Sequence, residues 1–91
     1  MKHASHHEQA PRLRRVEGQV RGIIRMVDDE RYCVDILTQL RAVRAALRRV
    51  EESVLREHVE HCLLDAARRG KRAEQQARID ELLDVISRFS G

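Results

Sequence analysis

A helical pattern that runs without a break from about Tyr32 to Arg69 limits how this 91-residue chain can fold. Apolar residues recur along it at steps of four and three, as in the seam of a coiled coil. A straight helix of this length would extend for about 57 Å at ~1.5 Å per residue, too long for a compact monomer. The pattern therefore predicts a helix whose seam is covered by a second chain. The seam residues are Ile36, Leu40, Val43, Leu47, Val50 and Val54.

Two shorter helical patterns flank the long one. Pro11 suits the first turn of a helix, and an apolar seam then continues to a helix end near 28–30. After Gly70, a last amphipathic segment reaches about Phe89. Because only 2% of the residues are aromatic, the core must be built from aliphatic side chains, which suits closely packed helices. We therefore expect an all-α protomer of three helices.

The polar residues 1–10 are expected to form a flexible arm before a single helical domain that spans residues 11–91. No apolar run approaches the ~20 residues that a membrane span needs. The first residues also lack the apolar stretch of a signal peptide. These features predict a cytoplasmic protein without a membrane partner, in which both cysteines stay reduced.

Positive charge is concentrated in one part of the chain. Residues 11–50 contain ten arginines and five acidic residues, whereas residues 51–65 contain one arginine and five acidic residues. A basic stripe of this kind suits nucleic acid or another polyanion. The alternative interpretation is an ordinary solvated helix surface.

A histidine and a cysteine on the long helix form a candidate metal-binding pair. His58 and Cys62 are four residues apart, so their side chains lie on one helix face. An imidazole and a thiolate placed in this way can hold one metal ion. A buried cysteine beside a surface histidine would give the same spacing.

Cys33 strengthens the metal-binding interpretation through geometry. It precedes His58 by 25 residues, about 38 Å along one straight helix, so the two cannot meet within a chain. They can meet if two long helices pair antiparallel, so that Cys33 of one chain faces His58 and Cys62 of the other. The same arrangement covers the apolar seam and creates two equivalent sites in a two-fold dimer.

Two thiolates and one imidazole form a soft set of three ligands, which favours Cu(I). Ni(II), Co(II) and Zn(II) usually take at least one more ligand, which leaves these metals as alternatives. His61 is one candidate for that ligand, although it points about 100° away from Cys62 on the helix. The N-terminal histidines are the others, and they are His3, His6 and His7.

The chain resembles the CsoR/RcnR family of bacterial metal-sensing repressors. The resemblance rests on three ordered blocks and covers about residues 11–88. These blocks are Arg12-Leu13-Arg14-Arg15-Val16-Glu17-Gly18-Gln19-Val20-Arg21-Gly22, the segment from Arg31-Tyr32-Cys33 to Ala46-Leu47, and Glu57-His58-Val59-Glu60-His61-Cys62.

The resemblance implies a three-helix protomer, an antiparallel four-helix-bundle dimer and a dimer-of-dimers tetramer. It also implies a repressor that binds operator DNA without metal and releases it when metal binds, so that efflux or detoxification genes are expressed. In the copper branch the ligands match Cys33, His58 and Cys62. Tyr32 and Glu81 match groups that lie just outside the ligands. Branches that are selective for nickel or cobalt commonly use an N-terminal histidine as a further metal ligand, and His3 matches such a residue.

Family basic positions match Arg12, Arg14 and Arg49, and Arg15 and Arg21 extend the same surface. These arginines are expected to contact mainly phosphates, which makes affinity depend on salt. The rival function is a metal buffer or helical adaptor that does not bind DNA. An enzyme with a small-molecule substrate is not expected, because the sequence has no glycine-rich phosphate loop and no nucleophile with an evident base.

Overall fold

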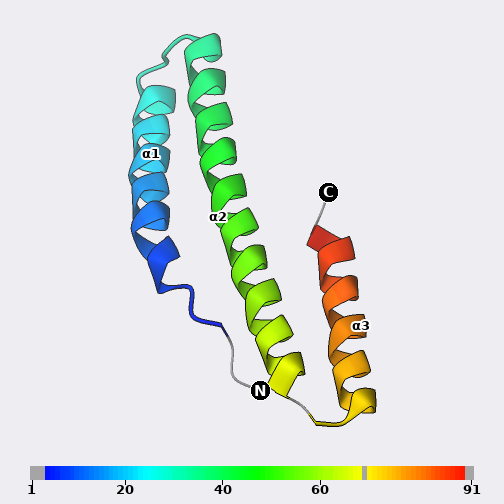
Figure 1. The fold of residues 1–91 in the computed structure, drawn as a ribbon. Helices are drawn as coiled ribbons and strands as arrows, with labels where there is room; N and C mark the ends of the chain where they lie inside the picture. The colour runs from blue at the N-terminus through cyan, green and yellow to red at the C-terminus, as the bar shows by residue number, and fades with distance from the viewer. Residues whose placement is uncertain (1–3, 69, 90–91) are drawn as a thin grey trace. The chain divides into compact units, whose positions relative to one another are not determined.

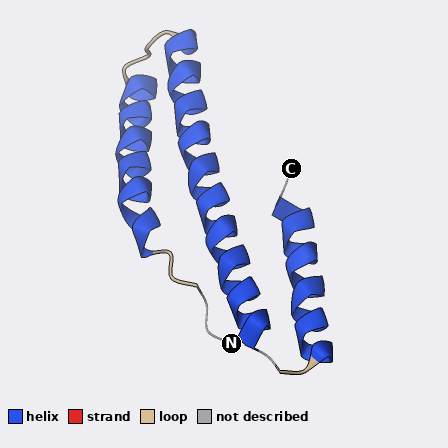
Figure 2. Cartoon of the chain, viewed as in Figure 1, coloured by secondary structure: helices blue, strands red, loops and turns tan. Residues whose placement is uncertain are grey.

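The computed structural model describes residues 4–68 and 70–89, and all the regular structure within those ranges is helical (Figure 2). The expected all-α protomer of three α-helices is therefore confirmed. A 3-10 turn, η1, precedes the α-helices. The elements are η1 (His7–Gln9), α1 (Ala10–Asp28), α2 (Cys33–Arg68) and α3 (Arg72–Phe89).

The helix boundaries agree with the sequence patterns to within one or two residues. Pro11 lies in the first turn of α1, where its missing N–H leaves no helical hydrogen bond unmade. The long helix begins at Cys33 rather than Tyr32. Its expected last residue, Arg69, lies outside the described residues, as does the candidate ligand His3.

The polar segment 1–10 is expected to be a flexible arm, but its last part has regular structure. His7–Gln9 form η1, and Gln9 is only 4% exposed. The Gln9 Oε1 atom accepts a hydrogen bond of 3.2 Å from Arg12. Sequence composition did not reveal this contact, because it joins two polar side chains and leaves no apolar pattern in the sequence.

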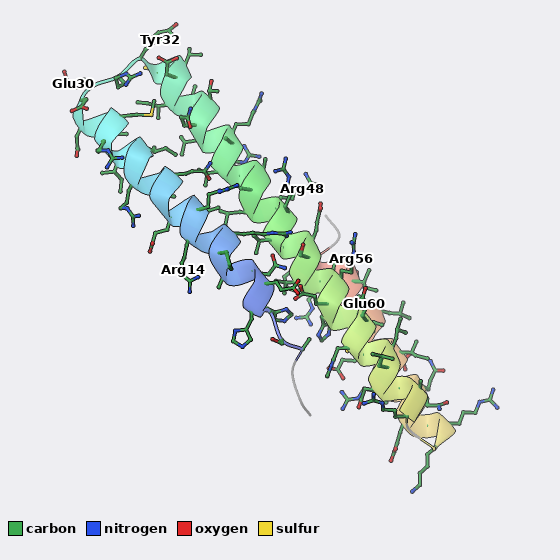
Figure 3. All side chains as sticks on the ribbon, turned by 60° about the vertical axis from the view of Figure 1, so that its left-hand side comes forward. Arg14, Glu30, Tyr32, Arg48, Arg56 and Glu60 are labelled. Carbon is green, nitrogen blue, oxygen red and sulfur yellow. The ribbon has the colours of Figure 1, made fainter. Side chains whose placement is uncertain are left out.

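A tight turn joins α1 to α2 (Figure 3). The amide of Arg31 donates to the carbonyl of Met26, and the amide of Glu30 donates to the carbonyl of Val27, at 2.9 and 3.1 Å. This pair of bonds defines a Schellman motif, which satisfies carbonyls at the end of α1. Glu30 occupies the left-handed position of the motif, with φ of 53°. That position usually holds glycine, because a side chain there approaches the following carbonyl oxygen.

Close contacts divide the chain into two compact units. The N-terminal unit comprises His6–Ser53, in which α1 runs beside the first part of α2 (Figure 1). Its core contains Val16 and Ile23 from α1 and Val43 from α2. Partly buried Ile36 and Ala46 pack against this cluster.

The N-terminal unit buries only half of each apolar seam. On α2, Val43 and Val50 are buried, whereas Leu40 and Leu47 are each 43% exposed. The same alternation occurs on α1, where the exposed seam residues follow one another every seven positions. The N-terminal unit by itself therefore leaves a second apolar stripe uncovered on both helices. On α1 the exposed seam residues are Leu13, Val20 and Val27.

The C-terminal unit contains the residues from Val54 onward together with the chain's first residues up to Ser5, and the segment around Gly70 lies between the end of α2 and the start of α3. Its buried side chains are Cys62, Ala66 and Leu82. No helix among the described residues has the length and hydrophobicity to span a membrane.

The turn after α1 yields a direct test. Glu30→Gly should increase the free energy of unfolding by about 1 kcal/mol, because glycine adopts the left-handed conformation without a steric penalty. Glu30→Ala is the matched control, since it removes the charge but keeps the Cβ atom. Urea unfolding at one fixed protein concentration measures both variants. A glycine variant no more stable than the alanine variant would contradict the backbone geometry at Glu30.

Candidate metal centre and basic surface

The end of α2 brings together the predicted imidazole and thiol. The Cys62 Sγ and His58 Nε2 atoms are 3.4 Å apart. Four residues of helix separate the two side chains, so they lie one above the other on the same face. Both are sheltered: Cys62 is 3% exposed and His58 is partly buried.

The distance between these two atoms fits a shared metal ion. Metal–sulfur and metal–nitrogen bonds of about 2.3 and 2.0 Å place the two ligand atoms roughly 3.5 Å apart in tetrahedral geometry. The observed 3.4 Å separation is close to this value. The same bond lengths in trigonal geometry place the ligand atoms roughly 3.7 Å apart. The two side chains, which are in hydrogen-bond contact, are therefore spaced close to what two ligands of one ion require.

Burial and neighbouring charges raise the pKa of the Cys62 thiol. Loss of solvent is the largest cause, followed by the negative charge of Glu81. The positive charge of Arg78 acts in the opposite direction, and Asp65 adds to the increase. The thiol is therefore protonated at neutral pH, so that a metal ion must displace a proton to bind its sulfur.

The charged neighbours of Cys62 come from both helices of the C-terminal unit. Arg78 of α3 contacts Asp65 of α2 and Glu81 of its own helix, in each case at 3.1 Å. Glu81, which the sequence resemblance places next to the ligands, acts electrostatically on the Cys62 thiol. Sequence reasoning missed Arg78 and Asp65. The spacing of Arg78 and Glu81 on one helix was visible, but nothing in the sequence paired Arg78 with a residue of the preceding helix.

The remaining predicted ligand, Cys33, is the first residue of α2, so α2 continues from Cys33 through Cys62 as one helix. Both cysteines are free thiols. Cys33 is exposed, and Tyr32 just before it is exposed too, at the start of the helix in Figure 3. The Tyr32 carbonyl accepts hydrogen bonds from the first amides of α2, those of Asp35 and Ile36.

Within the described part of one chain, no three His, Cys, Asp or Glu side chains are placed to hold a metal ion together. The single chain thus brings together two of the three predicted ligands. His61 is partly buried beside Cys62 in the sequence, and His6 and His7 lie at the start of the N-terminal unit.

Three of the predicted DNA-contacting arginines gather around one hollow in the N-terminal unit. Arg12 and Arg15 of α1 and Arg49 of α2 line a cavity of about 680 Å³. The Arg12 guanidinium donates to Ser53 Oγ at 3.2 Å, besides its bond to Gln9. This surface therefore combines three arginines with apolar lining residues. The apolar residues are Pro11, Val16, Ala42, Ala45 and Ala46.

The other two predicted arginines do not line the hollow. Arg21 forms an exposed ion pair of 3.2 Å with Glu17, one turn earlier on α1. Arg14 leaves α1 on the side opposite α2 (Figure 3). The structure therefore divides the predicted basic surface into three clustered arginines and two separate ones.

A helical protomer with a thiol–imidazole pair and a cluster of arginines defines the class of small helical metal-sensing regulators. Comparison with known proteins gives the family. The model of the metal-sensitive transcriptional repressor family matches residues 5–88, so the chain belongs to that family. The family resemblance expected from the three sequence blocks is thus confirmed, and the protein is a transcriptional regulator rather than an enzyme.

Several relatives sense copper. The copper-sensing repressor CsoR of Bacillus subtilis is 49% identical over 79 residues, which cover 87% of this chain and 75% of the relative. The copper-sensing repressor RicR of Mycobacterium tuberculosis is 50% identical over 80 residues, which cover 81% of this chain and 83% of the relative.

Two solved structures are also similar. The copper-sensing repressor CsoR with Cu(I) from Geobacillus thermodenitrificans is 46% identical, with a TM-score of 0.74 and coverage of 100% of this chain and 95% of its own. The nickel-responsive regulator InrS is 37% identical, with a TM-score of 0.72 and coverage of 92% and 94%.

The raised pKa of Cys62 predicts how its thiol reacts. In a Cys33→Ser background, alkylation of metal-free protein by iodoacetamide should have its pH midpoint above that of the same thiol in urea. The reason is that the thiolate is the nucleophile and folding disfavours it here. The alkylation rate against pH, measured by mass spectrometry, gives both midpoints. A folded-state midpoint at or below the unfolded one would contradict the buried environment of Cys62.

Proposed function

We propose that this protein is a copper-responsive repressor, which binds operator DNA without metal and releases it when Cu(I) binds. Cys33 of one chain and His58 and Cys62 of another supply the three ligands. The observation that carries the proposal is the 3.4 Å separation of His58 Nε2 and Cys62 Sγ, which suits two ligands of one ion. A three-coordinate ion then needs one further ligand. Genes for metal efflux or detoxification are the proposed targets.

The uncovered apolar stripes support a second chain as the source of that ligand. Leu40 and Leu47 are exposed on α2, and Cys33 precedes Leu40 by the same seven residues that separate the two leucines. Cys33 therefore lies on the stripe that a partner helix would cover. An antiparallel partner brings its own His58 and Cys62 toward this Cys33. The proposed assembly is a two-fold dimer, and two dimers form a tetramer.

The donor set favours Cu(I) over other metals. Two thiolates and one imidazole make a soft, three-coordinate site, whereas Ni(II), Co(II) and Zn(II) usually need more ligands. Similarity to copper-sensing relatives supports the same choice. Nickel or cobalt is the second candidate, because InrS is similar and His3 could add a ligand. X-ray absorption spectroscopy with each metal separates the two. Three-coordinate copper with two sulfur ligands supports copper, and six-coordinate nickel that loses a ligand without His3 supports nickel.

Metal binding and DNA release are proposed to communicate through the helices. A shared ion ties the start of α2 in one chain to the end of α2 in its partner. Contacts of Tyr32 and Glu81 with the ligands then bias α3, and the assembly shifts to a form whose arginine surface no longer fits DNA. Coupling of about 1–3 kcal/mol between the two sites is enough for such a switch. Such a regulator would act in the cytoplasm, where its operator is located and its thiols stay reduced.

Removal of Cys33, the ligand proposed to come from the second chain, should abolish the response to Cu(I) but leave DNA binding intact. Cys33→Ala is expected to bind DNA as tightly as the wild type without metal, but to remain bound when Cu(I) is added. Cys33 lies outside the proposed DNA surface, so only the metal response is lost. Fluorescence anisotropy with a fragment selected from genomic DNA by the metal-free protein measures both. Full release of the variant by Cu(I) would show that the ligand assignment is wrong.

The arginine-lined hollow predicts the converse result, a variant with weaker DNA binding and unchanged Cu(I) binding. Arg49→Ala should weaken operator binding by about tenfold and reduce its salt dependence by about one ion per lost phosphate contact. Cu(I) affinity should stay unchanged. Arg48→Ala is the neighbouring control, because Arg48 pairs with Glu52 at 3.4 Å and does not line the hollow.

Equal losses of operator affinity in Arg49→Ala and Arg48→Ala would show that the hollow has no special role in DNA binding. A wild-type protein that binds Cu(I) but shifts no genomic DNA would instead favour the rival function, a metal buffer or helical adaptor.

A further inference from the structure

Arg78 differs from three other ion-paired arginines among the described residues. Its side chain is 18% exposed, and it contacts carboxylates on both helices of the C-terminal unit. By contrast, three pairs join residues of a single helix, and their side chains are 61–75% exposed. These pairs are Arg21–Glu17, Arg48–Glu52 and Arg88–Asp84.

The guanidinium of Arg78 bridges two carboxylates with separate nitrogen atoms. Its Nε lies 3.1 Å from Asp65 Oδ2, and its Nη1 lies 3.1 Å from Glu81 Oε2. The contact with Asp65, whose side chain is 31% exposed, is partly buried, and charge-assisted contacts of this kind are stronger than exposed ones. The contact with Glu81 is more open to salt and solvent, because the Glu81 side chain is 52% exposed. The planar fork of arginine allows both contacts at once, whereas a lysine ammonium has no such fixed geometry.

This bridge lies beside the proposed metal ligands. Asp65 follows Cys62 by three residues on α2, and Glu81 precedes buried Leu82 on α3. All three charges of the bridge act on Cys62. Without the guanidinium, the two carboxylates would repel each other and would repel a metal-bound thiolate sulfur. Arg78 therefore has two effects. It fastens α3 to α2, and its positive charge reduces the repulsion between the carboxylates and a metal-bound thiolate.

We propose that Arg78 is a positioning residue of the sensing site, which holds α3 and Glu81 against the α2 segment that bears Cys62. This inference rests on the proposed function, because the event that it transmits is metal binding at that segment. The Arg78 bridge is then the link by which occupancy of the site is passed to α3. Neither Arg78 nor Asp65 needs to touch the metal for this role.

The test compares Arg78→Gln with Arg88→Gln, which removes the same charge from an exposed pair on the same helix. Three quantities are measured: amide hydrogen exchange of α3 in the metal-free protein, Cu(I) affinity by competition with bicinchoninate, and operator affinity with and without Cu(I). Arg78→Gln should speed exchange in α3 by about tenfold, as expected for the loss of a partly buried charged contact. It should also reduce the copper-induced change in operator affinity by about tenfold or more. Arg88→Gln should leave both within about twofold of the wild type.

Two further variants keep the test valid if Arg78→Gln does not fold. Asp65→Asn removes the bridge from the α2 side and should reproduce the effect of Arg78→Gln. Arg78→Lys keeps the charge but not the two-pronged geometry, so it should restore only part of the copper response.

Several outcomes would overturn the inference. An Arg78→Gln or Asp65→Asn protein that loses stability but keeps the wild-type ratio of operator affinities has lost only a structural contact. Unchanged exchange in α3 would show that the bridge does not fasten the helix. If wild-type protein binds DNA but ignores Cu(I), the proposed function fails, and the exchange experiment still decides whether Arg78 docks α3.

Discussion

The continuity of α2 is the constraint on which the rest of this structure depends. One helix from Cys33 to Arg68 contributes to the cores of both compact units and has a predicted ligand near each end. Its apolar seam is wider than one neighbouring helix can cover: Val43 packs with Val16 and Ile23 of α1, whereas Leu40 and Leu47 are exposed. Most of the stability of a helix in a protein comes from packing of its apolar face, so an exposed stripe on a long helix favours a further covering surface. The proposed association and the proposed metal site therefore depend on the same structural element.

The environment of Cys62 adds an electrostatic constraint. A thiol that is buried and faces carboxylates remains protonated, so the metal-free site carries little charge of its own. The positive charge of Arg78 offsets the two carboxylates that surround it. At the proposed site, one Cu(I) ion would displace the protons of two thiols, so the net charge of the site would fall by one. The proposed ligand chemistry and the packing of α3 on α2 would then meet at one place in the C-terminal unit.

The parts of the site that depend on local geometry could be predicted from the sequence. The four-residue spacing of His58 and Cys62 determines their proximity, because helix periodicity alone places both on one face. The family resemblance placed Glu81 beside the site, and the structure finds its charge acting on Cys62. Arg78 could not be found in this way, since its contact with Asp65 crosses the turn at Gly70. Contacts across a turn depend on how two helices dock, which no periodic pattern encodes.

By itself, the sequence determined the three helices, their approximate ends, the apolar seams and the thiol–imidazole pair. These features follow from backbone propensity and periodicity, which act over a few residues. Only the tertiary structure decided which half of each seam is buried, which arginines share a hollow, and how Glu30 ends α1 without a glycine. Those outcomes depend on the facing helix, because burial and electrostatic contact require atoms from two elements. The protein is thus a family member whose predicted ligands can be read from its sequence, while the contacts between the segment that bears them and α3 arise only from packing.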